Sequence, residues 1–202
     1  CVQPAFVIGR PDTVQLLCQP ELRASFKALQ LYSISFPPHE QRESASQARI
    51  LANPAYHFDV ICDNGEFIGE ILYWDIGGTF YIEHFCILPA MRNKRYGQKI
   101  LSAYRSAPLI LEIDPPVNEI SLRRKGFYER CGFVENPYLH IHPPYHRKDA
   151  GHELVIMSLP DRLKSDEYAR FYHYLQNTVR ETPIRFLLSI LSRSLVKHHC
   201  EP

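Results

Sequence analysis

The sequence predicts an α+β domain built around one central sheet, mixed but mostly antiparallel and flanked by helices. Helical patterns come first, a meander of strands joined by tight turns follows, and strand and helix patterns then alternate up to about residue 160. With 202 residues and 45% hydrophobic composition, the chain can bury one good core, or a core with an appendage.

The N-terminal part is expected to be mostly helical after a short strand at residues 6–8. Pro20 can open a helix that runs to about Phe36, because proline is tolerated in the first helical turn. The two prolines that follow stop this helix, and a second one is expected from about His39 to Leu51.

An antiparallel meander of three strands is expected next. Residues 57–62 alternate between apolar and polar, and Asp63-Asn64-Gly65 has the composition of a hairpin turn. Residues 67–74 return along the first strand, and residues 80–88 form the third.

Helix and strand patterns alternate in the remainder of the domain. A helical period begins after Gly97, and residues 109–113 form a short strand of the buried type. Residues 118–131 are expected to form a helix with Ile120 on its inward face, and residues 153–157 form the last strand.

Two amphipathic helices are expected after residue 160. The first carries Phe171 and Leu175 on its apolar face, and the second carries Leu187 and Leu191. We expect residues 161–202 to pack on the domain or on a partner chain, in which case they would form a homodimer. No apolar run approaches the roughly 20 residues that cross a bilayer, so no membrane span is expected.

Charge and cysteine usage exclude several classes of protein. The formal net charge is only +1, so no basic field favours nucleic acid as a partner. The six cysteines form no Cys-x-x-Cys pair, and a disulfide framework would need a smaller chain with closer spacing. A cytoplasmic location is therefore expected.

The segment from Tyr81 to Leu101 carries the strongest functional signal, because it joins a strand, a cation-rich loop and the start of a helix. The free N–H groups and the dipole of a helix start attract anions, and Arg92, Lys94 and Arg95 add positive charge there. A pyrophosphate group is the expected anion. Basic residues at loop ends are also commonly just solvated, so the segment alone does not decide the function.

Two motifs together resemble the GCN5-related N-acetyltransferase (GNAT) superfamily. Residues 92–97, Arg-Asn-Lys-Arg-Tyr-Gly, are similar to its phosphate loop Arg/Gln-x-x-Gly-x-Gly/Ala. Residues 126–133, Gly-Phe-Tyr-Glu-Arg-Cys-Gly-Phe, are similar to its Phe/Leu-Tyr-Glu-x-x-Gly-Phe motif. One helix and one strand separate the two motifs, as in the family. The resemblance implies a GNAT-like acyl-CoA N-acyltransferase fold over residues 1–160.

The implied function is transfer of an acetyl group from acetyl-CoA to a primary amine by direct attack in a ternary complex. Acetyl-CoA is the cosubstrate, and no metal is required. A non-catalytic acyl-CoA-binding sensor or regulatory module on the same fold is the alternative. A small amine, an amino acid and a protein all remain open as acceptors.

The resemblance also assigns catalytic roles. Tyr128 matches the family tyrosine whose hydroxyl points at the coenzyme sulfur, which makes it the expected acid for the leaving thiolate. Glu83, on the strand before the phosphate loop, and Glu112, on the next strand, are alternative bases. A carboxylate among apolar strand residues should have a raised pKa, which suits a proton relay. Strand alternation places His84 on the face opposite Glu83, where a structural role is expected.

Coenzyme contacts follow from the same motifs. The backbone of residues 85–87 is expected to meet the pantetheine amides, and residues 92–98 are expected to hold the pyrophosphate chiefly through N–H groups. The full expected set is Phe85, Cys86, Ile87, Arg92, Asn93, Lys94, Arg95, Tyr96, Gly97, Gln98 and Ser121. Ser121 stands where many members have asparagine. Arg95 replaces the first glycine of the loop, where a positive φ would cost a side chain about 1 kcal/mol.

Three histidines, His140, His142 and His146, lie close together between residues 138 and 146. No cysteine or carboxylate completes a ligand set at zinc-like spacing, so no metal site is expected. The loop is expected to form a wall on the substrate side, where Tyr138 and Tyr145 offer aromatic surface.

Overall fold

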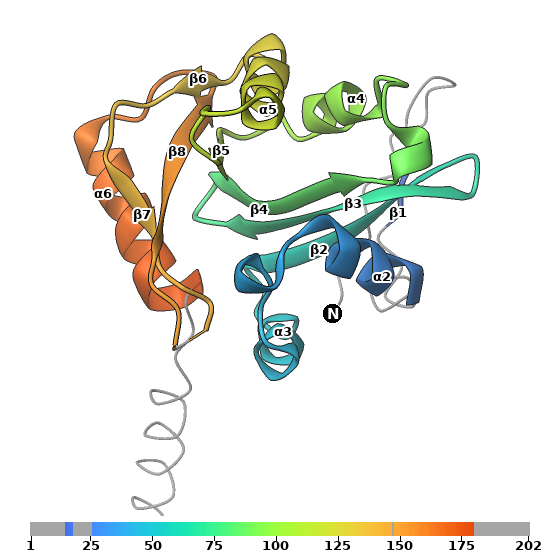
Figure 1. The fold of residues 1–202 in the computed structure, drawn as a ribbon, viewed down its shortest axis with the longest axis horizontal. Coiled ribbons are helices and arrows are strands. Elements are labelled where there is room, and N and C mark those ends of the chain that lie inside the picture. The colour runs from blue at the N-terminus through green and yellow to red at the C-terminus, as the bar shows by residue number, and fades with distance from the viewer. Residues whose placement is uncertain (1–14, 18–25, 147, 180–202) are drawn as a thin grey trace, which may run out of the picture.

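The computed structural model describes residues 15–17, 26–146 and 148–179, and it consists of one sheet with helices on both faces (Figure 1). The α+β class and the mostly antiparallel sheet predicted from the sequence are confirmed. The expected strand at residues 6–8, the start of the helix at Pro20 and the second C-terminal helix lie outside the described residues. No helix within the described ranges has the length and apolar character needed to cross a membrane.

Eight strands and five α-helices are described, together with three single-turn helices. In chain order the elements are β1 (Gln15–Leu17), α2 (Phe26–Ser35), a 3-10 turn (Pro38–Glu40), α3 (Ser44–Ile50), β2 (Tyr56–Asp63), β3 (Glu66–Asp75), β4 (Phe80–Ile87), a 3-10 turn (Pro89–Met91), α4 (Tyr96–Ala103), β5 (Leu109–Ile113), α5 (Glu119–Arg130), β6 (Val134–Glu135), β7 (His140–His142), β8 (His152–Leu159), α6 (Ser165–Tyr174) and a π-helical turn (Leu175–Val179).

The strand order is β1-β2-β3-β4-β5-β8-β6, and β7 also pairs with β8. Every pair is antiparallel except β4–β5, which is parallel. The expected hairpin turn joins β2 to β3, where Asn64 and Gly65 have φ of 49° and 80°. Neither β6 nor β7 was predicted, because strands of two and three residues are too short to show a period-2 pattern.

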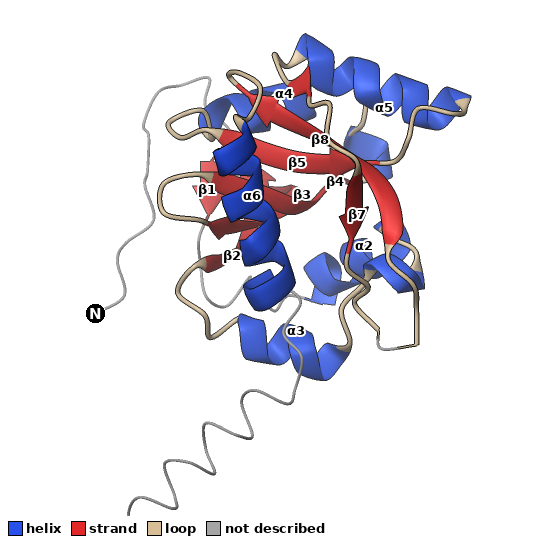
Figure 2. Cartoon of the chain, turned by 90° about the vertical axis from the view of Figure 1, so that its left-hand side faces the viewer, coloured by secondary structure: helices blue, strands red, loops and turns tan. Residues whose placement is uncertain are grey.

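Two clusters of buried side chains hold the layers together. One lies between the sheet and α2, α3 and α6, and Trp74, Tyr81 and Phe171 belong to it. The other lies between the sheet and α4 and α5, and it includes Ile100 and Leu111. Figure 1 shows α4 and α5 on one side of the sheet and α2 and α3 on the other. Helix α6 lies beside β7 in Figure 1, and the ring of its Phe171 stacks on His140 of β7. In Figure 2 this helix crosses in front of the sheet.

Two local expectations are wrong. The helix expected from His39 to Leu51 is divided into a 3-10 turn and α3, because Gln41 is extended with φ −93° and ψ 142°. This break turns the side chain of Arg42 into the interior, where the residue is only 7% exposed. Ile120 does not face inward on α5. It is 72% exposed, at the rim of the cavity described below.

Strand β4 contains a β-bulge at Glu83, because Ile82 and His84 pair with the adjacent residues Tyr73 and Leu72 of β3. The extra residue shifts the alternation, so Glu83 and His84 both face α2 and α3. The ring of His84 packs on two aromatic rings from the α2 region, and Glu83 bonds to an indole on that same face. The expectation that His84 faces away from Glu83 is therefore wrong.

Gly69 of β3 allows β4 to run unusually close to it just after the bulge. A Cβ atom at this position would lie 2.3 Å from the carbonyl oxygen of Cys86 and 3.1 Å from Cα of Ile87. Both neighbouring atoms belong to the backbone, so only a movement of the strand could relieve the clash. The course of β4 at these two residues therefore depends on a glycine in β3.

Candidate active site

Strands β4 and β5 begin as a parallel pair and then diverge. The pairing joins residues 80–82 to residues 109–111, although β4 continues to Ile87 and β5 to Ile113. Beyond the paired residues, the side chains of Glu83 and Glu112 are 0% and 6% exposed, yet each residue as a whole is partly exposed. The exposed part is therefore mainly backbone, and it faces the opening between the strands.

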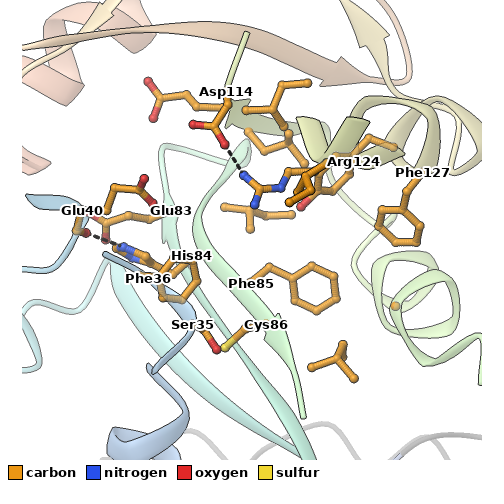
Figure 3. A pocket seen from close by; sticks show the side chains of 18 of the residues that line it. Ser35, Phe36, Glu40, Glu83, His84, Phe85, Cys86, Asp114, Arg124 and Phe127 are labelled. Carbon is orange, nitrogen blue, oxygen red and sulfur yellow. Dashed lines mark hydrogen bonds and ion pairs between the residues drawn. The ribbon is translucent and has the colours of Figure 1, made fainter. Parts of the chain in front are cut away.

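A cavity of about 800 Å³ occupies this opening. In Figure 3, Glu83, His84 and Cys86 of β4 lie across from Arg124 and Phe127 of α5. The predicted site residues that line the cavity are Glu83, Phe85, Cys86, Ile87, Arg92, Asn93, Arg95, Tyr96, Gly97, Gln98, Glu112 and Tyr128.

Two predicted residues lie outside this lining. Lys94 is exposed, and its Nζ atom contacts Sδ of Met91 at 3.4 Å. Ser121 is buried in the first turn of α5, where its N–H donates to Oδ1 of Asn118 at 2.9 Å and its hydroxyl accepts from the N–H of Asn118 at 3.1 Å. Ser121 therefore completes a capping box that stabilises the start of α5.

The loop before α4 leaves the start of that helix without a side-chain cap. Arg95 occupies the N-cap position and makes no side-chain capping bond, so the first N–H groups of α4 are available to a ligand. The loop is tied to its surroundings at both ends. Nε of Arg92 donates to the carbonyl of Ile87 at 3.2 Å, and the hydroxyl of Tyr96 donates to Oδ2 of Asp63 at 2.7 Å.

Gly97 connects this loop to α5 by close packing. A Cβ atom at Gly97 would lie 2.9 Å from the ring of Phe127, the residue next to Tyr128. The absence of a side chain at Gly97 thus lets the first turn of α4 and the middle of α5 line one cavity together.

Arg95 has φ of 64°, in the left-handed region where a side chain is strained. We expect Arg95→Gly to raise the free energy of unfolding by roughly 0.5–1 kcal/mol, because relief of strain exceeds the greater unfolded freedom of glycine. Urea denaturation measures the change. Arg95→Ala removes the same charge but keeps the strain, so it should bring no gain. Asn93→Gly should bring less, since asparagine tolerates its φ of 64° better. Equal effects of all three variants would contradict the assignment of strain.

Tyr128 lies in an apolar part of the cavity wall. Its ring meets those of Phe127 and Phe133 with centroids 5.1 and 5.6 Å apart. Burial raises the pKa of Tyr128 to about 12, although Arg124 acts in the opposite direction. The hydroxyl therefore keeps its proton at neutral pH, which a general acid requires.

Glu83 is the centre of a buried polar cluster. Its carboxylate accepts hydrogen bonds from Nη2 of Arg42 at 2.5 Å, from the hydroxyl of Tyr145 at 2.8 Å and from Nε1 of Trp74 at 3.0 Å. Burial alone would raise the pKa of Glu83, but Arg42, His84 and Tyr145 outweigh it, and the pKa is lowered. The expected raised pKa is wrong, because the partners come from segments far away in the sequence.

Glu112 is held in a second buried cluster. It accepts from the hydroxyl of Tyr81 at 2.5 Å, bonds to Nε2 of His140, and lies 3.7 Å from Nε2 of His142. Burial again acts to raise the pKa, but the two histidines and Tyr81 lower it overall. For Glu112, too, the expected raised pKa is wrong.

Several residues of the site were not assigned from the sequence. Arg42 lies in a segment expected to be helical, and no pattern there marks it as buried. His142 was placed only in the substrate-side loop. The two-residue spacing of His140 and His142, which puts both side chains on one face of a strand, was the available signal. Glu70 of β3 is buried beneath the cavity, where its carboxylate accepts from Sγ of Cys86 at 3.4 Å, and burial raises its pKa to about 8.

Metal ligation has no evident centre in the described part of the chain. No group of three or more His, Cys, Asp or Glu side chains there could hold a metal ion. His140 and His142 instead share one carboxylate, that of Glu112.

Comparisons with known proteins agree with this geometry. A family model described as an acetyltransferase (GNAT) domain matches residues 54–135. A GNAT-family protein from Bacteroides thetaiotaomicron is 30% identical, covers 83% of this chain and 98% of its own, and superposes with a TM-score of 0.75. The ribosomal-protein-S18-alanine N-acetyltransferase from Escherichia coli is 18% identical, with coverage of 76% and 96% and a TM-score of 0.50. A search of the curated proteins found no match.

Strands β4 and β5 diverge, the start of α4 is uncapped, and one cavity joins the two features. Together with the comparisons, they define an acetyltransferase-type domain, which implies acyl transfer from acetyl-CoA. The chain belongs to the GNAT family, as its 30% identity to a family member over 83% of its length shows. The family and the fold predicted from the two motifs are therefore confirmed. The similarity to the Escherichia coli enzyme supports the fold alone.

Proposed function

We propose that the protein transfers an acetyl group from acetyl-CoA to a primary amine, by direct attack within a ternary complex. One observation carries the proposal. A single cavity joins the open edge of β4, the uncapped start of α4 and the hydroxyl-bearing Tyr128. An extended thioester with a diphosphate at one end needs these three features side by side.

The coenzyme fits the cavity in one direction. Its pyrophosphate would bind the N–H groups of residues 92–98, where the helix dipole and nearby cations favour negative charge. Its pantetheine amides would pair with the open backbone of residues 85–87, as an added strand would. A backbone N–H near Cys86 or Ile87 would then stabilise the oxyanion that forms on the thioester carbonyl.

Tyr128 would supply the proton for the departing thiolate. Its pKa of about 12 keeps the hydroxyl protonated at neutral pH, and the ring lines the cavity. The leaving sulfur becomes basic only as the C–S bond breaks, so the transfer favours the transition state.

The two predicted glutamates differ in their suitability for proton removal. Glu83 forms a buried ion pair with Arg42 and accepts two further hydrogen bonds, which favours a structural role. Glu112 lies beside His142, a titratable group that also lines the cavity. We therefore assign Glu112, rather than Glu83, to the path by which the amine loses its proton.

Thiol release from acetyl-CoA tests the proposal. The protein should bind coenzyme A in a calorimetric titration, and it should release free thiol in the presence of a suitable amine from a panel of alkylamines, amino acids and peptides. Lack of coenzyme association at millimolar concentration would refute the assignment. Association without thiol release across the panel would instead identify a coenzyme-binding sensor.

A further inference from the structure

We propose that His142 is the catalytic base that takes the proton from the amine, and that Glu112 is the residue that positions it. The inference rests on the proposed function and deepens it, because it names a group outside both sequence motifs.

His142 has an unusual combination of burial and missing partners. Its side chain is only 3% exposed, and it lines the 800 Å³ cavity. Neither Nδ1 nor Nε2 has a hydrogen-bond partner among the described residues. A buried polar group without a partner is unfavourable, so a ring left in this state beside a cavity is expected to bond a ligand there.

Glu112 is placed to support the charged form of this ring. Its Oε2 atom lies 3.7 Å from Nε2 of His142, while Tyr81 and His140 fix the carboxylate from the other sides. A carboxylate held beside an imidazole stabilises the imidazolium that forms when the base accepts a proton. The lowered pKa of Glu112 makes it a weak base at neutral pH but a good permanent anion for this purpose.

A route to solvent leads away from the base. His152 lies directly opposite His142 in the β7–β8 pair, and their ring centroids are 5.6 Å apart. The ring of His39, which is 56% exposed, lies 5.7 Å beyond His152. Burial, with a further contribution from the neighbouring His142, lowers the pKa of His152, so this ring is neutral at neutral pH. Rings at these distances would exchange protons through bridging water.

The reaction requires such an exit. A primary ammonium carries three protons on nitrogen. One remains on the amide product, and one ends on the thiol of coenzyme A, by way of Tyr128. The third must reach solvent. In our assignment His142 takes this third proton before attack. The free amine then forms the C–N bond, the C–S bond breaks, and Tyr128 donates to the sulfur and regains a proton from the nitrogen.

The surroundings of His142 determine how its protonation responds to pH. Several elements packed around the ring contribute ionisable groups near it. These groups are Glu40 from the turn after α2, His84 from β4, Glu112 from β5, His140 from β7 itself, Tyr145 from the loop after β7 and His152 from β8. Of these, Glu112 is the carboxylate that forms an ion pair with His142.

His142→Asn tests the proposal with an alkylamine that the wild-type protein acetylates. We expect kcat at pH 7 to fall about 10²–10³-fold. The wild-type kcat should fall at acid pH as the base becomes protonated. In the variant this acid limb of the pH profile should be absent. Its kcat should instead increase with pH until the pH reaches the pKa of the bound amine. With 4-methoxyaniline, an arylamine that is already uncharged at pH 7, the loss should be less than about tenfold, since no ammonium proton has to leave.

Two further variants separate a base from a structural residue. Glu112→Gln should move the acid limb to lower pH, because removal of the carboxylate destabilises the imidazolium. His173→Asn, on the exposed end of α6, should leave the profile unchanged. Coenzyme A affinity, measured by calorimetry, should be the same for all variants.

The possible failures are distinguishable. No amine-dependent thiol release by the wild-type protein would refute the proposed function, and this inference with it. Release that His142→Asn leaves intact, with its acid limb in place, would refute only the role of His142.

Discussion

Replacement of Tyr128 by phenylalanine is expected to lower kcat by about 10²–10⁴-fold, while coenzyme A binds with unchanged affinity. The variant keeps the ring and its contacts with Phe127 and Phe133, so the apolar wall survives. Only the proton donor is lost, and the thiolate must then leave without one. Steady-state thiol release together with calorimetric titration measures both quantities.

Tyr174→Phe provides the matched control. Tyr174 is the last residue of α6, packs against the core and does not line the cavity. It should retain wild-type kcat. If Tyr128→Phe kept kcat within a factor of about three of the wild type, Tyr128 would have no part in proton transfer.

Replacement of Glu83 by glutamine is expected to lower the free energy of unfolding by about 3–5 kcal/mol. Arg42 and Glu83 have side chains only 2% and 0% exposed, so the variant leaves an uncompensated charge in the interior. Because the pKa of Glu83 is lowered in the folded protein, the pair stabilises above the ordinary glutamate pKa. That contribution is lost as pH falls through the lowered value. Urea denaturation at several pH values should show the deficit shrinking in acid.

The double variant Arg42→Met with Glu83→Leu isolates the ion pair. It removes both charges together, so it should be less destabilised than Glu83→Gln, even though Trp74 and Tyr145 lose an acceptor. If the free energy of unfolding of Glu83→Gln lay within about 1 kcal/mol of the wild-type value, the two charges would not be coupled in this way.

Local patterns predicted the fold well wherever an element is long enough to repeat its period. The meander, the helix after Gly97 and the strand at residues 109–113 all lie within a few residues of their expected bounds. Ile120 was placed wrongly because periodicity identifies an apolar stripe but not whether protein or an open cavity faces it. The bulge at Glu83 was missed for a similar reason, since it depends on the pairing with β3 and not on residues in β4.

The site was predictable as far as its motifs extend. Twelve of the predicted residues line one cavity, because the phosphate loop and the tyrosine motif each follow a recognisable local sequence. Arg42 comes from a segment with no such signal, and His142 from one whose signal is only the spacing of two histidines. The fold brings these two residues to Glu83 and Glu112. The same distant partners explain why both glutamates have lowered and not raised pKa values.

Gly69 makes the shape of the cavity along β4 depend on a residue that does not line the cavity. Any larger amino acid there would displace the stretch of β4 on which the pantetheine arm is proposed to lie. Variants designed to accept longer acyl chains should therefore keep Gly69 and replace residues of α5 on the opposite wall of the cavity. The β3–β4 hairpin, which lies outside both signature motifs, thus determines the shape of the cavity along β4.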